Sequence, residues 1–337
     1  MSVKIAINGF GRIGRPTLRR ILEKHPEIEV AAINDLTGTK TLAHLLKYDS
    51  IYGQYDKKVD YDENNLIVSG KKIKILAEKE PEKLPWKDLG IDVILECTGF
   101  FTDYKGAGRH LKAGAKKVII SAPCKSPSVA HFVLGVNADK YEPSKDHIVS
   151  MGSCTTNCLA PVAKVLHDNF EIESGLMTTI HSYTNTQKLL DSPDEDIRRA
   201  RAAAISMIPT TTGAATSVVK TIPELEGKID GLAIRIPTPI VSLVDFVAKV
   251  KKETTAEKVN LIFKKAAQSE EMEGILTIED ESLVSIDFKG NSYSAIIDGQ
   301  ATMVERGNLI KVLAWYDNEW GYACRLAEFA EYIGKKL

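Results

Sequence analysis

The chain has 337 residues, which is enough for two domains of ordinary size. Its 44% hydrophobic and 26% charged residues are typical of globular proteins with substantial cores, and a net charge of −1 argues against general attraction to nucleic acid or anionic membranes. Five cysteines form no paired framework, and the N-terminal segment has no signal-peptide pattern. We therefore expect a cytoplasmic protein without a membrane span, whose partners are recognised at specific sites.

The first half of the chain alternates short β-rich runs with helical patterns. A strand at residues 3–8, a helix at 13–24 and a strand at 28–34 are expected first. Further strands are predicted at 72–76, 93–97, 118–121 and 147–151, with a helix at 104–113. Strands separated by helices indicate right-handed crossovers, so this half predicts an α/β, Rossmann-type domain with a doubly wound parallel sheet.

The pattern changes after a helix that begins near residue 154. Strands are predicted at 176–181, 232–236, 241–250, 283–288, 294–297 and 309–315, with helices at 256–268 and 322–335. Fewer helices between strands indicate an α+β domain with a mostly antiparallel sheet. We expect a nucleotide-binding domain at 1–153, a catalytic domain at 154–318, and a C-terminal helix at 319–337 that packs back on the first domain.

A glycine-rich turn follows the first predicted strand. Gly9, Gly11 and Gly14 form the pattern G-x-G-x-x-G, in which the glycines allow a tight turn, close approach of a pyrophosphate and close packing of helix on strand. The second strand ends at Asp35, where a carboxylate binds ribose hydroxyls and repels a 2′-phosphate. The alternative for Asp35 is a turn or helix-cap residue, but the combined pattern predicts a dinucleotide site that favours NAD over NADP.

Cys154 is the candidate nucleophile. It lies in the run Ser153-Cys154-Thr155, at or just before the start of a predicted helix, where unpaired N–H groups and the helix dipole favour a thiolate. The alternative is a buried cysteine that behaves as a small hydrophobe. Cys158 lies four residues on, but no histidine or cysteine cluster with zinc-ligand spacing accompanies the pair, and no metal is expected.

His181 is the candidate base among seven histidines. It ends a predicted strand and opens a polar run, and strand ends that lead into loops commonly carry catalytic side chains. A structural histidine is the alternative. Solvated side chains are expected instead for four histidines in charged or helical segments: His25, His110, His147 and His167.

Three further segments contain groups that suit phosphate. Arg199 belongs to a basic cluster, residues 209–214 offer hydroxyls and amides ahead of a helical pattern, and Arg235 lies in an otherwise apolar strand. The alternative for the arginines is a solvated charged surface, and the alternative for residues 209–214 is a simple loop. Arg235 fits a solvated surface least, because its strand is otherwise apolar.

Together these residues resemble the phosphorylating glyceraldehyde-3-phosphate dehydrogenases over essentially the whole chain. The matching segments are 7–15, 34–35, 42–50, 153–161, 181–185, 198–204, 208–215 and 315–319. The resemblance implies attack of Cys154 on the aldehyde of glyceraldehyde 3-phosphate, with His181 as base, and hydride transfer to NAD. Inorganic phosphate then breaks the resulting thioester and releases 1,3-bisphosphoglycerate.

The same resemblance assigns ligand contacts residue by residue. The substrate phosphate is expected at Thr184, Arg199 and Arg235. The attacking phosphate is expected at Ser153, Thr155, Thr212 and Gly213, with Arg199 able to serve both. Cofactor contacts are expected from the glycine turn with Arg12 and Ile13, and from Asp35, Lys79, Ser121 and Asn318. A homotetramer is implied, with the loop at 182–207 at a subunit interface.

This chain departs from the usual family pattern in two places. Met151 and Gly152 replace an asparagine and an alanine before the nucleophile, which removes polar contacts. Ser192 precedes Pro193 where strongly NAD-specific relatives have an apolar residue, which leaves NADP open as a secondary cofactor. Rival interpretations are a related dehydrogenase acting on erythrose 4-phosphate or a semialdehyde, and a nucleotide-sensing or RNA-binding protein on the same fold.

Overall fold

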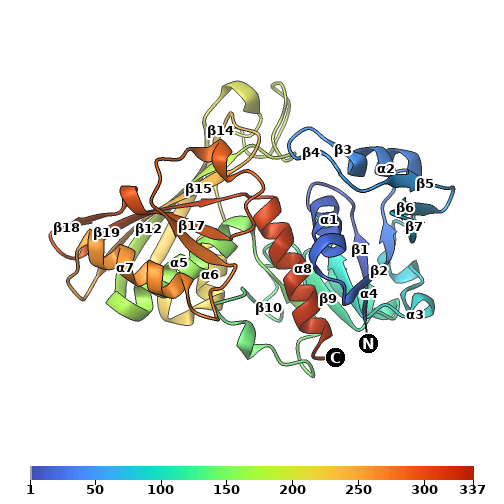
Figure 1. Cartoon of the computed structure of the whole chain (residues 1–337), viewed down its shortest axis with the longest axis horizontal. Coiled ribbons are helices and arrows are strands. Elements are labelled where there is room, and N and C mark those ends of the chain that lie inside the picture. Colours follow the sequence, from blue (N-terminus) through green and yellow to red (C-terminus); the bar gives the residue numbers. More distant parts are fainter. Residues whose placement is uncertain (1) are drawn as a thin grey trace. The chain divides into compact units, whose positions relative to one another are not determined.

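The computed structural model describes residues 2–337 and divides into two compact units, each built on its own sheet (Figure 1). The first unit contains residues 2–132, 140–152 and 323–337, and the second contains residues 133–139 and 153–322. Within residues 2–337, no helix is long and apolar enough to cross a membrane.

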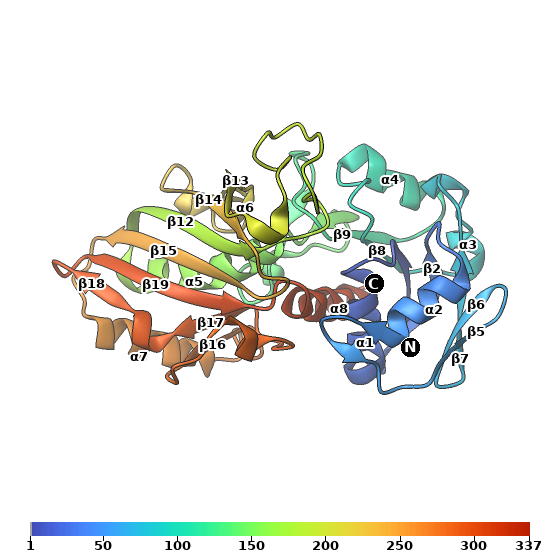
Figure 2. The same ribbon diagram turned by 90° about the horizontal axis from the view of Figure 1, so that it is seen from above.

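The sheet of the first unit has the order β10-β11-β9-β8-β1-β2-β7-β6-β5. It is parallel from β10 to β7 and ends in an antiparallel meander, which Figure 2 shows beside α2 (Thr39–Lys47). The strands are β1 (Val3–Asn8), β2 (Ile28–Asn34), β5 (Val59–Tyr61), β6 (Asn65–Val68), β7 (Lys71–Leu76), β8 (Val93–Glu96), β9 (Lys117–Ile120), β10 (Ala130–His131) and β11 (Ile148–Ser150). The chain extends from β1 through β2 to β7 on one side and through β8 to β9 on the other. This reversal creates a ligand crevice at the carboxyl ends of β1 and β8.

Both faces of the central strands are buried, as a doubly wound sheet requires. Ala6 and Ile94 pack in one core with residues of α3 (Trp86–Leu89) and α4 (Tyr104–Lys112). Ile5 and Ile7, which point to the opposite face, are equally buried. The predicted Rossmann-type domain is therefore confirmed.

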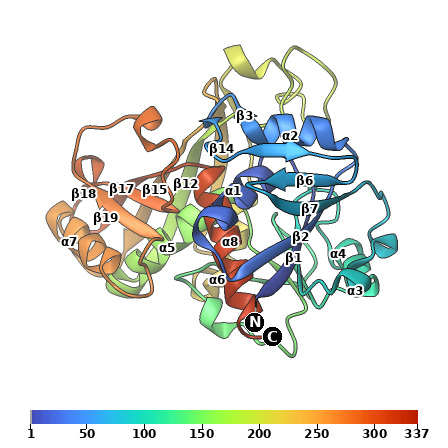
Figure 3. The ribbon, with the colours of Figure 1, turned by 45° about the vertical axis from the view of Figure 1, so that its right-hand side comes forward.

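The C-terminal helix α8 (Trp320–Gly334) lies beside α1 (Gly14–Lys24), as Figures 1 and 3 show. Two contacts join them: the His25 Nδ1 to Glu331 Oε2 distance is 2.5 Å, and the Arg20 Nη2 to Glu328 Oε1 distance is 3.3 Å. Residues 323–337 belong to the first unit.

The sheet of the second unit has the order β13-β14-β12-β15-β19-β17-β16, with β18 paired to β19, and most of its pairs are antiparallel. Its core packs against α5 (Cys154–Phe170), α6 (Ala214–Thr221) and α7 (Ala256–Ala267). The strands are β12 (Ile172–Ser182), β13 (Ile208–Thr211), β14 (Ile229–Ile236), β15 (Ser242–Val250), β16 (Leu276–Glu279), β17 (Ala295–Asp298), β18 (Met303–Glu305) and β19 (Leu309–Tyr316). The other face carries exposed apolar side chains, including Leu176, Leu232 and Leu309.

The structure corrects two expectations and adds one strand. The strand predicted at 283–288 is a 3₁₀ helix, Ser285–Phe288, because the Asp287 carboxylate caps the Val284 amide at 2.8 Å. The structure also contains edge strand β13, which was not predicted; Pro209 is tolerated there because one side of the strand is unpaired. His25 and His110 are buried rather than solvated, because they contact Glu331 and Glu96.

Candidate active site

Helix α5 begins at Cys154, as predicted. Ser153 is its N-cap: the Ser153 hydroxyl accepts the Thr156 amide at 3.1 Å, and the Thr156 hydroxyl accepts the Ser153 amide at the same distance. This reciprocal capping box fixes the first turn. The Cys154 thiol is therefore held at a defined helix start, half-buried, with the Thr155 amide directed at its sulfur.

His181 lies against the Cys154 thiol. Its Nε2 is 3.4 Å from Sγ, and the residue is 4% exposed near the end of β12. The ring packs edge-on against Tyr316, with centroids 6.1 Å apart. The structure therefore brings together the two residues that the sequence selected as nucleophile and base.

Arg235 lies beside the same histidine. Strand β14 runs parallel to β12 in a register that pairs Arg235 with His181. The Arg235 Nη1 atom is 2.7 Å from His181 Nδ1 and donates to the Ser182 carbonyl at 3.0 Å. The half-buried guanidinium thus has a partner, and it holds a positive charge next to the candidate base.

Burial opposes charge on both members of the cysteine–histidine pair. Burial raises the pKa of the Cys154 thiol, although Arg235 and the Thr155 amide act in the opposite direction. Burial, and then the Arg235 charge, lower the pKa of His181 to about 3. The expected thiolate at the helix start is therefore opposed by desolvation, which the sequence pattern did not reveal. His181 Nδ1 also lies 2.7 Å from the Ser182 carbonyl, which can only accept, so Nδ1 and Arg235 both donate to that oxygen and Nε2 carries no proton. A neutral His181 can therefore still accept the thiol proton at Nε2, and the transfer forms opposite charges 3.4 Å apart.

Tyr316 braces this site and was missed as a site residue. Its hydroxyl is 2.9 Å from Thr155 Oγ1 and 2.8 Å from Thr179 Oγ1, so it ties the start of α5 to β12. Burial raises the pKa of Tyr316 well above its ordinary value, so the phenol stays neutral. The sequence signals were its place directly after the strand predicted at 309–315 and within the family-matching segment 315–319. Its neighbour Asn318 accepts the Ser242 hydroxyl at 3.1 Å.

A second polar group forms around Arg199. Its Nε donates to Thr210 Oγ1 at 2.7 Å, and its Nη2 donates to the Thr211 carbonyl at 3.3 Å. The Thr212 hydroxyl accepts the Ala214 amide at 3.2 Å at the start of α6, and Gly213 is the N-cap. The structure therefore gathers Arg199 with the threonine segment, whereas the Thr184 hydroxyl contacts Thr186 at 2.9 Å.

The glycine turn of the first unit borders a cavity of about 540 Å³. Gly9 has a φ of 93°, and a side chain there would meet the Thr98 backbone at 2.7 Å. A Cβ on Gly14 would lie 2.3 Å from the Gly9 carbonyl oxygen, whereas Gly11 opens onto free space. The cavity also borders Asp35, Lys79 and Phe100.

Asp35 shapes this cavity as well as lining it. Its two carboxylate oxygens accept the Phe10 and Thr37 amides, each at 2.9 Å, so it holds the glycine turn against the end of β2. Arg12 is 2.5 Å from Asp49, and Ser121 hydrogen-bonds the Cys97 thiol. An open glycine turn with a carboxylate beside it fits a dinucleotide with free ribose hydroxyls.

The fold and the two sites fit a class of proteins, the nucleotide-dependent dehydrogenases that act through a cysteine. Comparison with known proteins agrees. A family model described as the NAD-binding domain of glyceraldehyde 3-phosphate dehydrogenase matches residues 3–104, and a model described as its C-terminal domain matches residues 153–318. The chain belongs to the glyceraldehyde-3-phosphate dehydrogenase family, which confirms the resemblance seen in the sequence.

Close relatives match along their full length. The chain is 55% identical to the glyceraldehyde-3-phosphate dehydrogenase of Geobacillus stearothermophilus over 336 residues, which cover 100% of this chain and 99% of the relative. It is 54% identical to glyceraldehyde-3-phosphate dehydrogenase 1 of Bacillus subtilis with the same coverage. The enzyme of Streptomyces coelicolor is 49% identical over 100% of both chains.

Proposed function

We propose that the protein oxidises and phosphorylates glyceraldehyde 3-phosphate to 1,3-bisphosphoglycerate with reduction of NAD. It belongs to the glyceraldehyde-3-phosphate dehydrogenase family, and NAD is its cofactor. The single observation that carries the chemistry is the distance of 3.4 Å between Cys154 Sγ and His181 Nε2. A thiol in reach of a neutral imidazole is the arrangement that nucleophilic catalysis by cysteine requires.

In the first step Sγ attacks the aldehyde carbon while His181 Nε2 takes the thiol proton. That proton then passes to the substrate oxygen, which becomes the hydroxyl of a thiohemiacetal. In the second step Nε2 takes the hydroxyl proton as the carbon loses a hydride, and a thioester remains on Cys154. NAD, when bound, accepts the hydride. Phosphate oxygen then attacks the thioester carbon, the C–S bond breaks, and the sulfur regains its proton from His181.

The anion-binding groups divide into two sets. Arg235 and Arg199, with Thr184, suit the substrate phosphate, because one guanidinium group can donate two parallel hydrogen bonds to two phosphate oxygens. The attacking phosphate is assigned to Ser153, Thr155, Thr212 and Gly213. The capped start of α5 and the glycine N-cap of α6 both offer backbone N–H groups near these residues.

Cofactor contacts are proposed on both sides of the glycine turn. The turn itself, with Arg12 and Ile13, suits the pyrophosphate, and Asp35 suits the adenosine ribose. Lys79 borders the same cavity. Ser121 completes the set in this unit, and Asn318 is assigned to the nicotinamide amide group by family resemblance.

Removing the charge of Asp35 should relax cofactor choice. Because the carboxylate repels a 2′-phosphate, Asp35→Gly should raise the ratio of kcat/KM for NADP to that for NAD by about tenfold or more. Asp35→Asn is a second, conservative variant: it also removes the charge but keeps an acceptor for one of the two amides now bound, at Phe10 or Thr37. Both variants should shift the ratio, and an unchanged ratio in both would place the selector elsewhere.

We also propose a homotetramer. The uncovered face of the second sheet and the loop at 182–207 carry large exposed apolar side chains, a feature of protein interfaces. In the loop these are Leu189, Leu190, Ile197, Ile205 and Met207, each at least 75% exposed. Light scattering should give about four times the chain mass of 37.1 kDa, and a monomer mass would refute the assembly. The five cysteines are free, which suits the reducing cytoplasm that we propose as its location.

The substrate is tested by initial rates with glyceraldehyde 3-phosphate, erythrose 4-phosphate and an unphosphorylated semialdehyde. Two anion sites predict the highest kcat/KM for glyceraldehyde 3-phosphate and a requirement for inorganic phosphate. A preference for one of the other aldehydes would move the assignment to that substrate while leaving the cysteine chemistry intact.

A further inference from the structure

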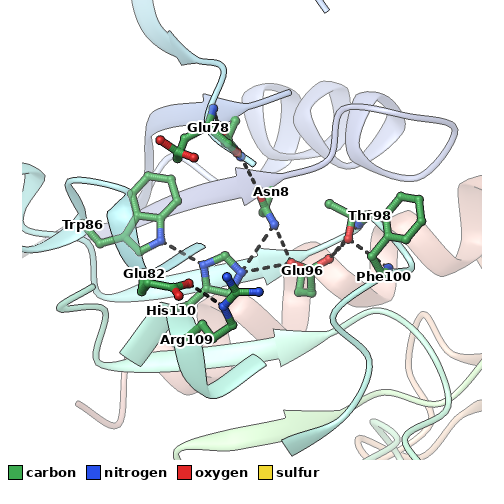
Figure 4. Close-up of polar contacts among 10 residues, drawn as sticks. Asn8, Glu78, Glu82, Trp86, Glu96, Thr98, Phe100, Arg109 and His110 are labelled. Carbon is green, nitrogen blue, oxygen red and sulfur yellow. Dashed lines mark hydrogen bonds and ion pairs between the residues drawn. The ribbon is translucent and has the colours of Figure 1, made fainter. Parts of the chain in front are cut away.

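The carboxyl ends of neighbouring strands in the first unit are joined by hydrogen bonds between buried side chains. Asn8, Asn34 and Glu96 are the last residues of β1, β2 and β8, and the register places Asn8 beside each of the others. Their exposed fractions are 1%, 6% and 1%. Glu78 follows β7, the next strand of the sheet. Figure 4 shows how Asn8 and His110 converge on Glu96 at the sheet edge.

The backbone of Glu78 fixes the direction of this chain of hydrogen bonds at one end. Its N–H donates to Asn34 Oδ1 and its carbonyl accepts from Asn34 Nδ2, both at 2.9 Å. Because Asn34 Nδ2 also donates to Asn8 Oδ1 at 2.7 Å, Asn8 must present its own Nδ2 to the next partner. That partner is Glu96 Oε2, 2.6 Å away.

Trp86 fixes the direction at the other end. Its indole nitrogen can only donate, and it donates to His110 Nδ1 at 2.9 Å. His110, which is fully buried, is therefore a neutral imidazole with its proton on Nε2, 3.0 Å from Glu96 Oε2. Asn8 Nδ2 lies 3.4 Å from the same ring nitrogen because both donors converge on one oxygen.

The second oxygen of Glu96 holds the loop after β8. It accepts the Thr98 amide at 2.8 Å and also the Thr98 hydroxyl, which in turn accepts the Phe100 amide at 3.0 Å. Four donors thus point at one buried side chain. An ionised carboxylate, which only accepts, satisfies all four.

These hydrogen bonds lie directly beneath the dinucleotide cavity. Asn8 and Asn34, at the ends of β1 and β2, line it together with Glu78, Thr98 and Phe100 from the loops after β7 and β8. We propose that Glu96 is a positioning residue for the cofactor, whose carboxylate holds these loops in binding geometry through Asn8 and Thr98. The inference rests on the proposed use of NAD, and it assigns a role to buried groups that the cysteine chemistry leaves unused.

The first test is Glu96→Gln, which keeps the shape but exchanges one acceptor for a donor. In either orientation, the NH₂ group of the introduced amide faces an N–H donor, from Asn8 and His110 on one side or from Thr98 on the other. These donors cannot reverse, because Glu78 and Trp86 fix the direction of the hydrogen bonds at both ends. Calorimetry should show the Kd for NAD rising about tenfold or more. The kcat at saturating NAD and the KM for the aldehyde should stay within about twofold, a split that general loss of structure would not produce.

The second test is rescue. Trp86→Phe removes the terminal donor, so His110 can move its proton to Nδ1 and offer Nε2 as an acceptor to the introduced amide. The Kd of the double variant for NAD should therefore rise less than the product of the fold-increases in the two single variants. Glu82→Gln is the matched control, because Glu82 pairs with Arg109 on the surface beside these residues (Figure 4) and should leave NAD binding unchanged.

Two results would overturn the role of Glu96: an unchanged Kd in Glu96→Gln, or losses in the double variant that simply multiply. If Glu96→Gln does not fold, Thr98→Val removes one of the four donors, and its Kd should rise several-fold; no rise would count equally against the role. Failure of the unaltered protein to bind NAD is a separate result, which would refute the proposed function itself.

Discussion

Cys154→Ser should lower kcat for glyceraldehyde 3-phosphate by about 10³-fold or more while leaving the Kd for NAD within about twofold. A serine hydroxyl is a far weaker nucleophile than a thiol next to a base, and His181 alone cannot form the thioester. The cofactor cavity lies in the other unit, so its lining is unaltered. Steady-state rates and calorimetry measure the two effects.

Cys158→Ser is the matched control for this variant. Cys158 lies one helical turn further along α5, and its buried thiol points to the Ala314 carbonyl at 3.8 Å, a partner that a serine hydroxyl can also use. Activity should persist in this variant. Near-normal turnover in Cys154→Ser would remove Cys154 from the role of nucleophile.

His181→Asn should lower kcat by about 10²- to 10⁴-fold, the usual contribution of a general base. It should also slow alkylation of Cys154 by iodoacetamide at pH 7. The sign follows from burial, which raises the pKa of the thiol. Without an imidazole to take the proton, little thiolate forms at neutral pH, and the alkylation rate recovers only as pH rises.

The exposed His44 supplies the control, since His44→Asn should change neither rate. Alkylation of His181→Asn at the unaltered rate, with the same pH profile, would show that the thiol is activated without His181. In that case the helix start and Arg235 would have to carry the activation.

Local patterns predicted much of the fold. The expected strands at 3–8 and 28–34 coincide with β1 and β2, because buried parallel strands flanking a glycine turn leave a strong local signal. The expected strand at 283–288 failed because two of its apolar residues, Val284 and Ile286, are 61% and 58% exposed, and a side-chain cap sets the backbone. The pattern of apolar and polar residues alone cannot distinguish a buried strand from an exposed segment that alternates by chance.

The candidate site shows the same limit. Cys154 and His181 were found because each stands at the end of an element, which is a local property. The Tyr316 brace, the pairing of Arg235 with His181 and the convergence on Glu96 join residues far apart in the sequence. Such contacts depend on strand register, and a single sequence does not specify register between distant strands.

Omission of phosphate tests the central claim most directly. If Cys154 holds a thioester that phosphate must break, then mixing enzyme, NAD and glyceraldehyde 3-phosphate without phosphate should give a burst of about one NADH per chain and then almost no turnover. Adding phosphate should start steady turnover at once. Sustained turnover without phosphate, or no burst before it is added, would contradict the account.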